Sequence, residues 1–361
     1  MPESTFDRSC GPSGCQIDWL TSRRLEVEDD VVAFTKLATD AGWGDGLPLV
    51  PPTEERVRAY VAASRRYPDE LVAELPPRRG RATIEKIAVN AVMAGAPAEA
   101  MPLLAAAIEA MTDPSFNLFA LNTTTSCVVP GVFVNGPVRD RLKIPYGPGC
   151  FGAEAGPAPA IGRAIRLLMR NVGGQVVGVS SKSVFGQPGR VTGIVVGEWE
   201  ERSPWAPLAV RRGISGDAVT VHGCTGTMDI ADIVADRGAD LVELIGKSMA
   251  FLGTNAFIGA GHGAEILLAL APPWAELIAA EYPRIEDLQS ALWHSAAMAV
   301  RLWPKPHQAR LAKDGRVDDR GLVHLVAAPA DLLVIVCGGL GSLHALALHS
   351  FGPTRSVTRP F

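Results

Sequence analysis

Short, uninterrupted hydrophobic runs alternate along the chain with segments whose apolar residues recur every three to four positions. The runs at 132–134, 193–196, 266–270 and 332–336 are too short for helices, and they predict buried strands. Helices are predicted at 28–42, 82–95, 98–111, 160–172, 229–252, 274–282 and 285–300. This alternation predicts an α/β fold, with α+β as the alternative.

The order of these elements repeats in the second half of the chain. VFVNGPVRDRL and LLALAPPWAEL both follow the pattern of strand, Pro turn and helix, and the later runs GIVV and VIVC also correspond. We therefore predict a single large domain of two pseudo-repeated α/β halves, 26–213 and 214–361, after a flexible polar leader at 1–25. A ligand site would lie where the strand ends of the two halves face each other. Chance similarity between α/β segments is the alternative.

Composition narrows the class of protein. The 361 residues include 34 Lys and Arg against 38 Asp and Glu, a net charge of −4, so nucleic acid is not a predicted partner. No apolar run approaches the roughly 20 residues that span a bilayer, and the start lacks the features of a signal peptide. A cytoplasmic location without membrane contact is the prediction. There the six cysteines are expected to be reduced thiols.

Glycine and proline mark the predicted strand ends. Of the 37 Gly and 28 Pro, 14 Gly and 9 Pro lie in GWGDGLPLVPP, VNGP, YGPGCFGAEAGPAP, GAGHG, APP and CGGLG. Most of these strings lie at the ends of predicted strands. We therefore expect them to form the walls of a binding site.

The loop at 145–159 carries the strongest local signal. Gly147, Gly149 and Gly152 let backbone N–H groups approach a ligand, and the loop leads into a helix N-terminus, which favours anions. Arg163 and Arg166 follow on roughly one face of that helix. We predict that these residues bind a carboxylate or phosphate; the alternative is a structural loop with solvated arginines.

Asn135 and Trp205 are predicted to complete the substrate site, Asn135 at a strand end and Trp205 in an Arg-containing loop segment. The glycine spacing matches neither the P-loop nor the dinucleotide fingerprint, so neither ATP nor NAD is predicted. The cofactor is therefore left unassigned.

Four residues are candidates for the chemistry. Cys150 lies near a helix N-terminus, which stabilises a thiolate, and Cys224 lies two residues after His222 on a turn. His262 lies between glycines and is the first choice for acid–base work. A metal held by His222, Cys224 and His262 is possible but not favoured, because a second Cys/His pair at matching spacing is missing.

The remaining cysteines receive no catalytic role. Cys127, in NTTTSCVV, is interpreted as an ordinary residue at the entry of a strand. Cys10 and Cys15 lie in the polar leader and are unexplained.

Several strings together resemble a known family. GDGLPLVPPTEERV, NAVMAG, VNGP, AIGRAIRL, ERSPWAPL and SVTRP are similar to motifs of an uncharacterised family of cytoplasmic bacterial proteins. Members of that family are often encoded beside small thiol or selenol proteins of the UGSC type, which resemble the B subunit of glycine reductase. The resemblance implies a small thiol or selenol protein as partner. Where the family has Pro-Glu-His-Ala, this chain has Pro272-Pro273-Trp274-Ala275.

These features predict an enzyme or enzyme subunit, of the oxidoreductase or lyase type. It would bind a small anionic substrate for thiol-dependent bond formation or cleavage at a carbon that bears a heteroatom. A metal-dependent enzyme and a non-catalytic partner subunit of a small redox protein are the alternatives. A homodimer is a possible oligomeric state.

Overall fold

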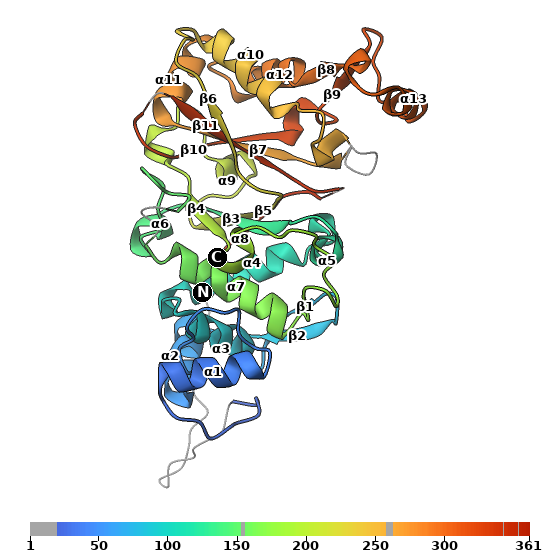
Figure 1. Ribbon diagram of the computed structural model, residues 1–361. Helices are drawn as coiled ribbons and strands as arrows, with labels where there is room; N and C mark the ends of the chain where they lie inside the picture. Colours follow the sequence, from blue (N-terminus) through green and yellow to red (C-terminus); the bar gives the residue numbers. More distant parts are fainter. Residues whose placement is uncertain (1–19, 153–155, 258–262, 342, 353) are drawn as a thin grey trace.

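The computed structural model describes residues 20–152, 156–257, 263–341, 343–352 and 354–361 (Figure 1). Its α-helices are α1 (Val31–Asp40), α2 (Glu54–Ser64), α3 (Ile84–Ala94), α4 (Met101–Met111), α5 (Leu118–Thr123), α6 (Val138–Arg141), α7 (Ala158–Asn171), α8 (Gly189–Thr192), α9 (Leu208–Arg211), α10 (Gly238–Met249), α11 (Pro272–Glu281), α12 (Ile285–Ser295) and α13 (Lys305–Lys313). Its strands are β1 (Leu71–Leu75), β2 (Gly80–Thr83), β3 (Val129–Asn135), β4 (Ile194–Gly197), β5 (Ala218–Cys224), β6 (Met228–Ala231), β7 (Ile266–Leu270), β8 (Ala297–Ala299), β9 (Leu322–His324), β10 (Leu332–Val336), β11 (His344–His349) and β12 (Val357–Pro360).

Two four-stranded sheets share one topology. The first has the order β12-β5-β3-β4 and the second the order β10-β7-β11-β6. In the first, β3 pairs in parallel with β4 and antiparallel with β5. In the second, β7 pairs in parallel with β10 and antiparallel with β11. The fold is α/β, as predicted, and its two sheets are topological counterparts.

One edge strand of each sheet comes from a segment that follows the other sheet's strands in sequence. β6 follows β5 in sequence but pairs with β11, and β12 follows β11 but pairs with β5. The sheets are thus linked by an exchange of edge strands. The proposed boundary between residues 213 and 214 places β5 and β12 in the second half, although both strands pair in the first sheet.

The two sheets pack face to face, because side chains on a strand alternate between its two faces. Leu267 and Ala269 of β7, with Leu333 and Ile335 of β10, point toward the first sheet and join a shared core with its Phe133. The alternate side chains of the same strands, such as those of Ile266, Leu268 and Leu270, point to the opposite face and pack under helices. This explains why these runs are hydrophobic at every position.

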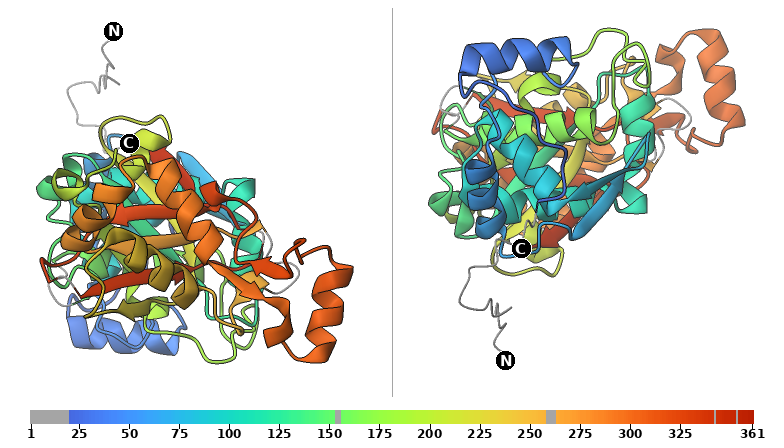
Figure 2. Two further views of the ribbon diagram at one scale, coloured as in Figure 1. Left: turned by 90° about the horizontal axis from the view of Figure 1, so that it is seen from above. Right: turned by 90° about the horizontal axis from the view of Figure 1, so that it is seen from below.

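Helices cover both outer faces (Figure 1). α4 contacts β5 and β12, and α7 contacts β4, on the side of α2 and α3. On the other side, α12 contacts β10, and α10 packs against both α11 and α12. Figure 2 shows α1 on the outside of the first helical layer and α13 projecting from the side of the molecule.

Most predicted elements are present, but two predicted helices include a strand. The predicted helix 285–300 ends as α12 at Ser295, and residues 297–299 form β8. The segment 229–252, predicted as one helix, divides into β6 and the later helix α10. The edge pairing of β6 with β11 fixes that extended segment, and local propensity does not report such a partner.

Candidate functional site

The carboxyl ends of the parallel strands from both sheets meet at one edge of the molecule. The backbone N–H of Trp199, just after β4, donates to the carbonyl of Val336 at the end of β10, at 2.7 Å. The N–H of Gly338 donates to the carbonyl of Tyr146 in the Gly-rich loop, at 2.8 Å. These bonds hold the loops of both halves together at the place where the sequence predicts a site.

Two buried thiols lie in one cluster at this edge. Cys150 lies in the Gly-rich loop and Cys337 directly follows β10, and the pKa of each thiol depends on the other. Both residues are buried, with 4% and 3% of their surface exposed. Sequence analysis identified Cys150 as a nucleophile but gave Cys337 no role.

The two thiols shift each other's pKa in opposite directions. The interaction with Cys337 is the largest factor that lowers the pKa of the Cys150 thiol. Burial opposes this effect, and the backbone amides of Gly338, Cys150 and Phe151 reinforce it. The interaction with Cys150, with burial and the charge of Glu198, raises the pKa of Cys337. Of the two thiols, Cys150 therefore loses its proton more readily.

Glu198 is a buried carboxyl group beside this pair. One of its oxygens, Oε2, accepts hydrogen bonds from Asn135 Nδ2 and from the backbone N–H of Leu208, each at 2.8 Å. The other oxygen, Oε1, has no partner among the described residues. Burial is the main cause that raises the pKa of Glu198. A buried carboxyl with a free oxygen can hold or accept a proton.

Polar side chains continue from Glu198 to the surface. Asn135 Nδ2 also donates to Glu200 Oε1 at 2.8 Å, and Glu200 forms an ion pair with Arg139. A surface recess of about 420 Å³ lies beside the Cys150 loop, lined by Arg139, Asp140 and the segment 143–148. The recess therefore leads to the loop that carries the thiolate.

Some of the residues predicted to bind substrate lie at this site, and Trp205 lies elsewhere. Cys150 N–H donates to the carbonyl of Gly147, and the N–H of Gly152 donates to that of Gly149, whose φ is +70°. Trp205 is buried in the core of the second sheet, and its Nε1 donates to the carbonyl of Tyr282 at 3.1 Å. Trp205 thus anchors the segment that leads to Leu208.

The two predicted arginines are engaged elsewhere. Arg163 donates to both carboxylate oxygens of Asp45, at 2.6 and 2.7 Å, and to the carbonyls of Pro48 and Leu47. Arg166 donates to the carbonyl of Arg190 and to Gln175 Oε1. Arg163 therefore holds the GDGLPL turn.

His222 and Cys224 lie on β5, inside the molecule. Both ring nitrogens of His222 are hydrogen-bonded, Nδ1 to Ser356 Oγ at 2.7 Å and Nε2 to the carbonyl of Leu348 at 3.0 Å. Burial lowers the pKa of His222 to about 4 and raises that of Cys224, so the neutral forms are favoured. His262 lies outside the described residues. Within the described part of the chain, no three His, Cys, Asp or Glu side chains are grouped to hold a metal ion.

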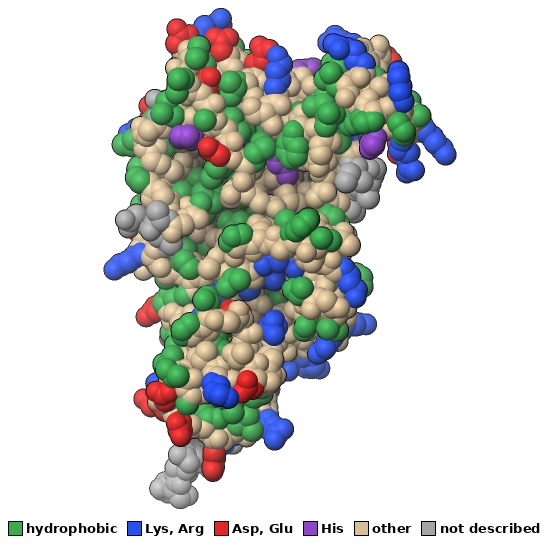
Figure 3. All heavy atoms as spheres, in the orientation of Figure 1, with side chains coloured by type: hydrophobic (Ala, Val, Ile, Leu, Met, Phe, Trp, Pro, Cys, Tyr) green, Lys and Arg blue, Asp and Glu red, His purple; other side chains and the backbone are tan. Residues whose placement is uncertain are grey.

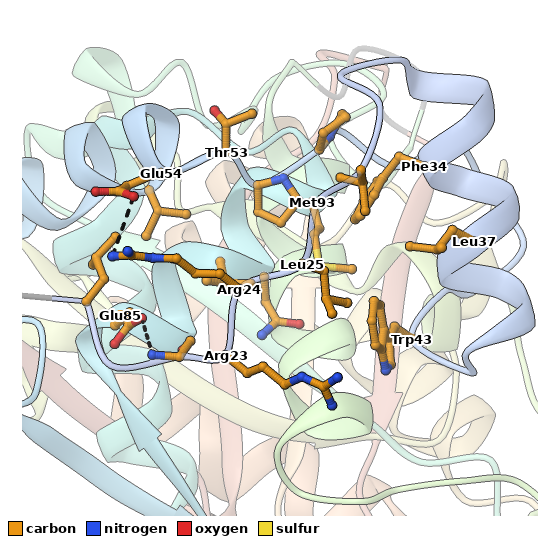
Figure 4. Close-up of a pocket in the computed structure, with 18 of the residues that line it drawn as sticks. Arg23, Arg24, Leu25, Phe34, Leu37, Trp43, Thr53, Glu54, Glu85 and Met93 are labelled. Atoms are coloured by element: carbon orange, nitrogen blue, oxygen red, sulfur yellow. Dashed lines mark hydrogen bonds and ion pairs between the residues drawn. The ribbon is translucent and has the colours of Figure 1, made fainter. Parts of the chain in front are cut away.

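A separate cavity of about 870 Å³ lies under the segment 20–29 (Figure 4). Apolar side chains such as Leu25, Phe34 and Trp43 line it. The segment is held in place at Glu85, which accepts from the backbone N–H groups of Thr21 and Ser22 at 2.9 Å each. Among the described candidates for chemistry, Cys150, His222 and Cys224 do not line this cavity.

Comparison with protein families and with curated proteins finds no match. The fold and the geometry of the site thus define an α/β protein with a buried thiol pair, and the resemblance to the bacterial family stays a prediction. No helix among the described residues is both long enough and apolar enough to cross a membrane.

Proposed function

We propose that the protein is a thiol-dependent oxidoreductase, in which Cys150 and Cys337 together reduce a small molecule that contains a disulfide bond. The observation that carries the proposal is that the two thiols lie in one buried cluster, where each shifts the pKa of the other. Such a pair gives one activated thiolate and a second sulfur within reach of it.

The reaction proceeds in two exchanges. The Cys150 thiolate attacks one sulfur of the substrate R–S–S–R, forms a mixed disulfide and releases R–S⁻, which takes up a proton. The Cys337 sulfur, after losing its proton, then attacks the Cys150 sulfur and releases the second R–S⁻, which also takes up a proton. The substrate gains two electrons and two protons, and the protein is left with a Cys150–Cys337 disulfide.

A thiol reductant returns the pair to its starting state. Two thiol groups reduce the Cys150–Cys337 disulfide and become a disulfide themselves. The small thiol or selenol partner that the family resemblance implies would be one source of such groups. A free low-molecular-weight thiol would serve the same chemistry.

Neighbouring groups support both steps. Glu198 acts electrostatically on Cys337 and has one oxygen without a partner, so it can accept the proton that Cys337 loses. Lys143 and Asp140 line the recess beside the loop, together with Arg139, which is paired with Glu200 and Glu201. The recess is therefore polar, with charges of both signs. The Gly-rich loop would have to open, since Cys150 itself is buried.

An aromatic disulfide tests the proposal directly. We expect 5,5′-dithiobis(2-nitrobenzoate) to release two coloured thiolates per Cys150–Cys337 pair, with peptide mass mapping showing the new internal disulfide. Cys337→Ser should stop at the mixed disulfide on Cys150, with one thiolate released. Cys150→Ser should give neither product at this pair.

Cys224→Ser is the matched control, because Cys224 is fully buried and its pKa is raised. It should leave both exchanges intact. Completion of the second exchange in Cys337→Ser, or an unmodified pair after prolonged exposure to the reagent, would contradict the proposal.

A further inference from the structure

A second polar cluster lies at the opposite edge of the sheets, where β3 and β4 begin and β5 and β11 end. Segments far apart in sequence meet there. The backbone N–H of Val184 donates to the carbonyl of Thr125, and that of Lys182 to the carbonyl of Thr123. The side chain of Asn255 donates to Ser126 Oγ, at 3.5 Å.

Cys127 lies within this cluster and is held by its neighbours. Its thiol donates to the carbonyl of Thr225 at 3.0 Å, and its own carbonyl accepts from Gln187 Nε2 at 2.5 Å. The same Gln187 nitrogen also donates to the carbonyl of Cys224. Unlike Cys150, Cys224 and Cys337, Cys127 is only partly buried.

Arg190 is fixed beside Cys127. Its Nε donates to the carbonyl of Val128 at 3.2 Å, and its Nη1 donates to Ser181 Oγ at 3.0 Å. Its Nη2 is buried and has no partner among the described residues. The charge of Arg190 interacts with Cys127. The bonds of Nε and Nη1 thus fix the orientation of the Arg190 guanidinium group, while Nη2 has no acceptor among the described residues.

Unpartnered polar atoms concentrate in or next to this cluster. Seven buried side-chain polar atoms lack a hydrogen bond in the described part of the chain. Five of the seven belong to the cluster or to residues directly beside its bonded members: Asn122, Ser183, Arg190, Thr254 and Ser350. Folded proteins pair nearly all such atoms, so a concentration of unpaired ones indicates a place for a polar ligand.

The charge of the cluster selects the kind of ligand. The segments 122–127, 181–190, 224–227, 254–255 and 349–352 contain Lys182 and Arg190 but neither Asp nor Glu. Arg166 adds a further positive charge, because its Nε donates to the carbonyl of Arg190. In Figure 3, Lys and Arg side chains gather in the middle of the face shown, at the level of α5 and α7, while acidic side chains lie mostly near the two ends.

We propose that this cluster is a binding site for a small carboxylate, which Arg190 Nη2 holds within reach of the Cys127 thiol. The hydroxyl group of Ser183 is the second donor to the carboxylate. The site is separate from the Cys150–Cys337 pair, since the two lie at opposite ends of β3 and β4. The proposal of a carboxylate site therefore does not depend on the proposed oxidoreductase function.

Two alkylating reagents of nearly equal size test this site. Iodoacetate carries a carboxylate and iodoacetamide is neutral, and each converts Cys–SH to a thioether with release of iodide and a proton. We expect iodoacetate to modify Cys127 about tenfold faster than iodoacetamide, the size of effect that a charge-assisted hydrogen bond gives. Peptide mass mapping assigns the rates to Cys127.

Variants and competitors separate the site from general charge effects. Arg190→Gln should abolish the preference for iodoacetate, and Arg190→Lys should keep part of it. Arg170→Gln, which removes a more exposed arginine from α7, is the control and should leave the preference unchanged. In the unchanged protein, acetate should slow the iodoacetate reaction and acetamide should not.

Three results would overturn the proposal. They are equal rates for the two reagents, a preference that persists in Arg190→Gln, and equal protection by acetate and acetamide. The competition measurement needs no substitution, so it decides the question even where Arg190→Gln fails to fold.

Discussion

Cys150, from the Gly-rich loop, and Cys337, which follows β10, lie in one buried cluster at the junction of the two sheets. Because the interaction with Cys337 is the main factor that lowers the pKa of Cys150, its loss should raise that pKa. We expect Cys337→Ala to shift the pH profile of Cys150 alkylation by a neutral reagent to higher pH. Cys337→Ser, which keeps a donor, should shift it less; identical profiles in the unchanged protein and Cys337→Ala would rule out this dependence.

The pair Arg163–Asp45 should matter for stability and not for thiol chemistry. Their side chains are only 10% and 14% exposed, and the ion pair is joined by two short hydrogen bonds. Removing one partner of such a pair costs about 3 kcal/mol, because the other charge is left uncompensated. We expect Arg163→Met to lower the free energy of unfolding in urea by about this amount.

Arg170→Gln is the control for Arg163→Met and should change the free energy of unfolding by less than about 0.5 kcal/mol. The rate of Cys150 alkylation should be the same in both variants under native conditions. A stable Arg163→Met protein with impaired binding of anions at the Gly-rich loop would instead favour the substrate-binding role predicted from the sequence.

Gly162 permits close packing of α7 against the start of β4. A Cβ atom at Gly162 would lie 2.3 Å from the carbonyl oxygen of Thr192 and 2.9 Å from the Cα of Gly193. Because both neighbours are backbone atoms, Gly162→Ala should destabilise the protein by about 2 kcal/mol or more. Gly152→Ala, where a Cβ would meet nothing within 4 Å, should be nearly neutral. Thermal unfolding of the two variants makes the comparison, and equal midpoints would show that the helix can shift.

Buried His222 should make the protein sensitive to acid. Its pKa is about 4 in the folded state, chiefly because of burial, against about 6.5 in the unfolded chain. Below pH 6.5 the unfolded state binds a proton that the folded state does not, so stability falls as the pH drops toward 4. The contribution lost is roughly 3 kcal/mol.

Urea unfolding at several pH values between 4 and 7 measures this effect. His222→Gln should flatten the slope in that window, while His294→Gln, at an exposed position of α12, should not. Buried His349, whose pKa is also lowered by burial, should leave part of the slope in place. An unchanged slope in His222→Gln would show that other groups control the acid response.

Hydrophobic periodicity by itself located the four strands that pair in parallel, β3 with β4 and β7 with β10, and most of the helices. Strand β7 and its parallel partner β10 are buried on both faces, which gives continuous apolar runs that are visible in the sequence. β6 and β12 are short edge strands. β6 follows β5 of the first sheet but lies at the edge of the second, and β12 follows β11 of the second sheet but lies at the edge of the first. Their strand character depends on partners distant in sequence, so local pattern could not report it.

For the candidate site, too, some features follow from local sequence and others depend on tertiary contacts. Glycine spacing and a helix N-terminus were enough to identify the Cys150 loop, because backbone freedom and helix dipoles are local properties. Only the packing of the two sheets brings Cys337 and Glu198 beside that loop. The same packing pairs Arg163 with Asp45 and leaves Arg190 with an unpaired nitrogen beside Cys127. The sequence therefore determined which elements and reactive groups exist; the tertiary structure decided which of them meet, because contacts between distant segments and the pKa shifts that follow arise only when the core forms.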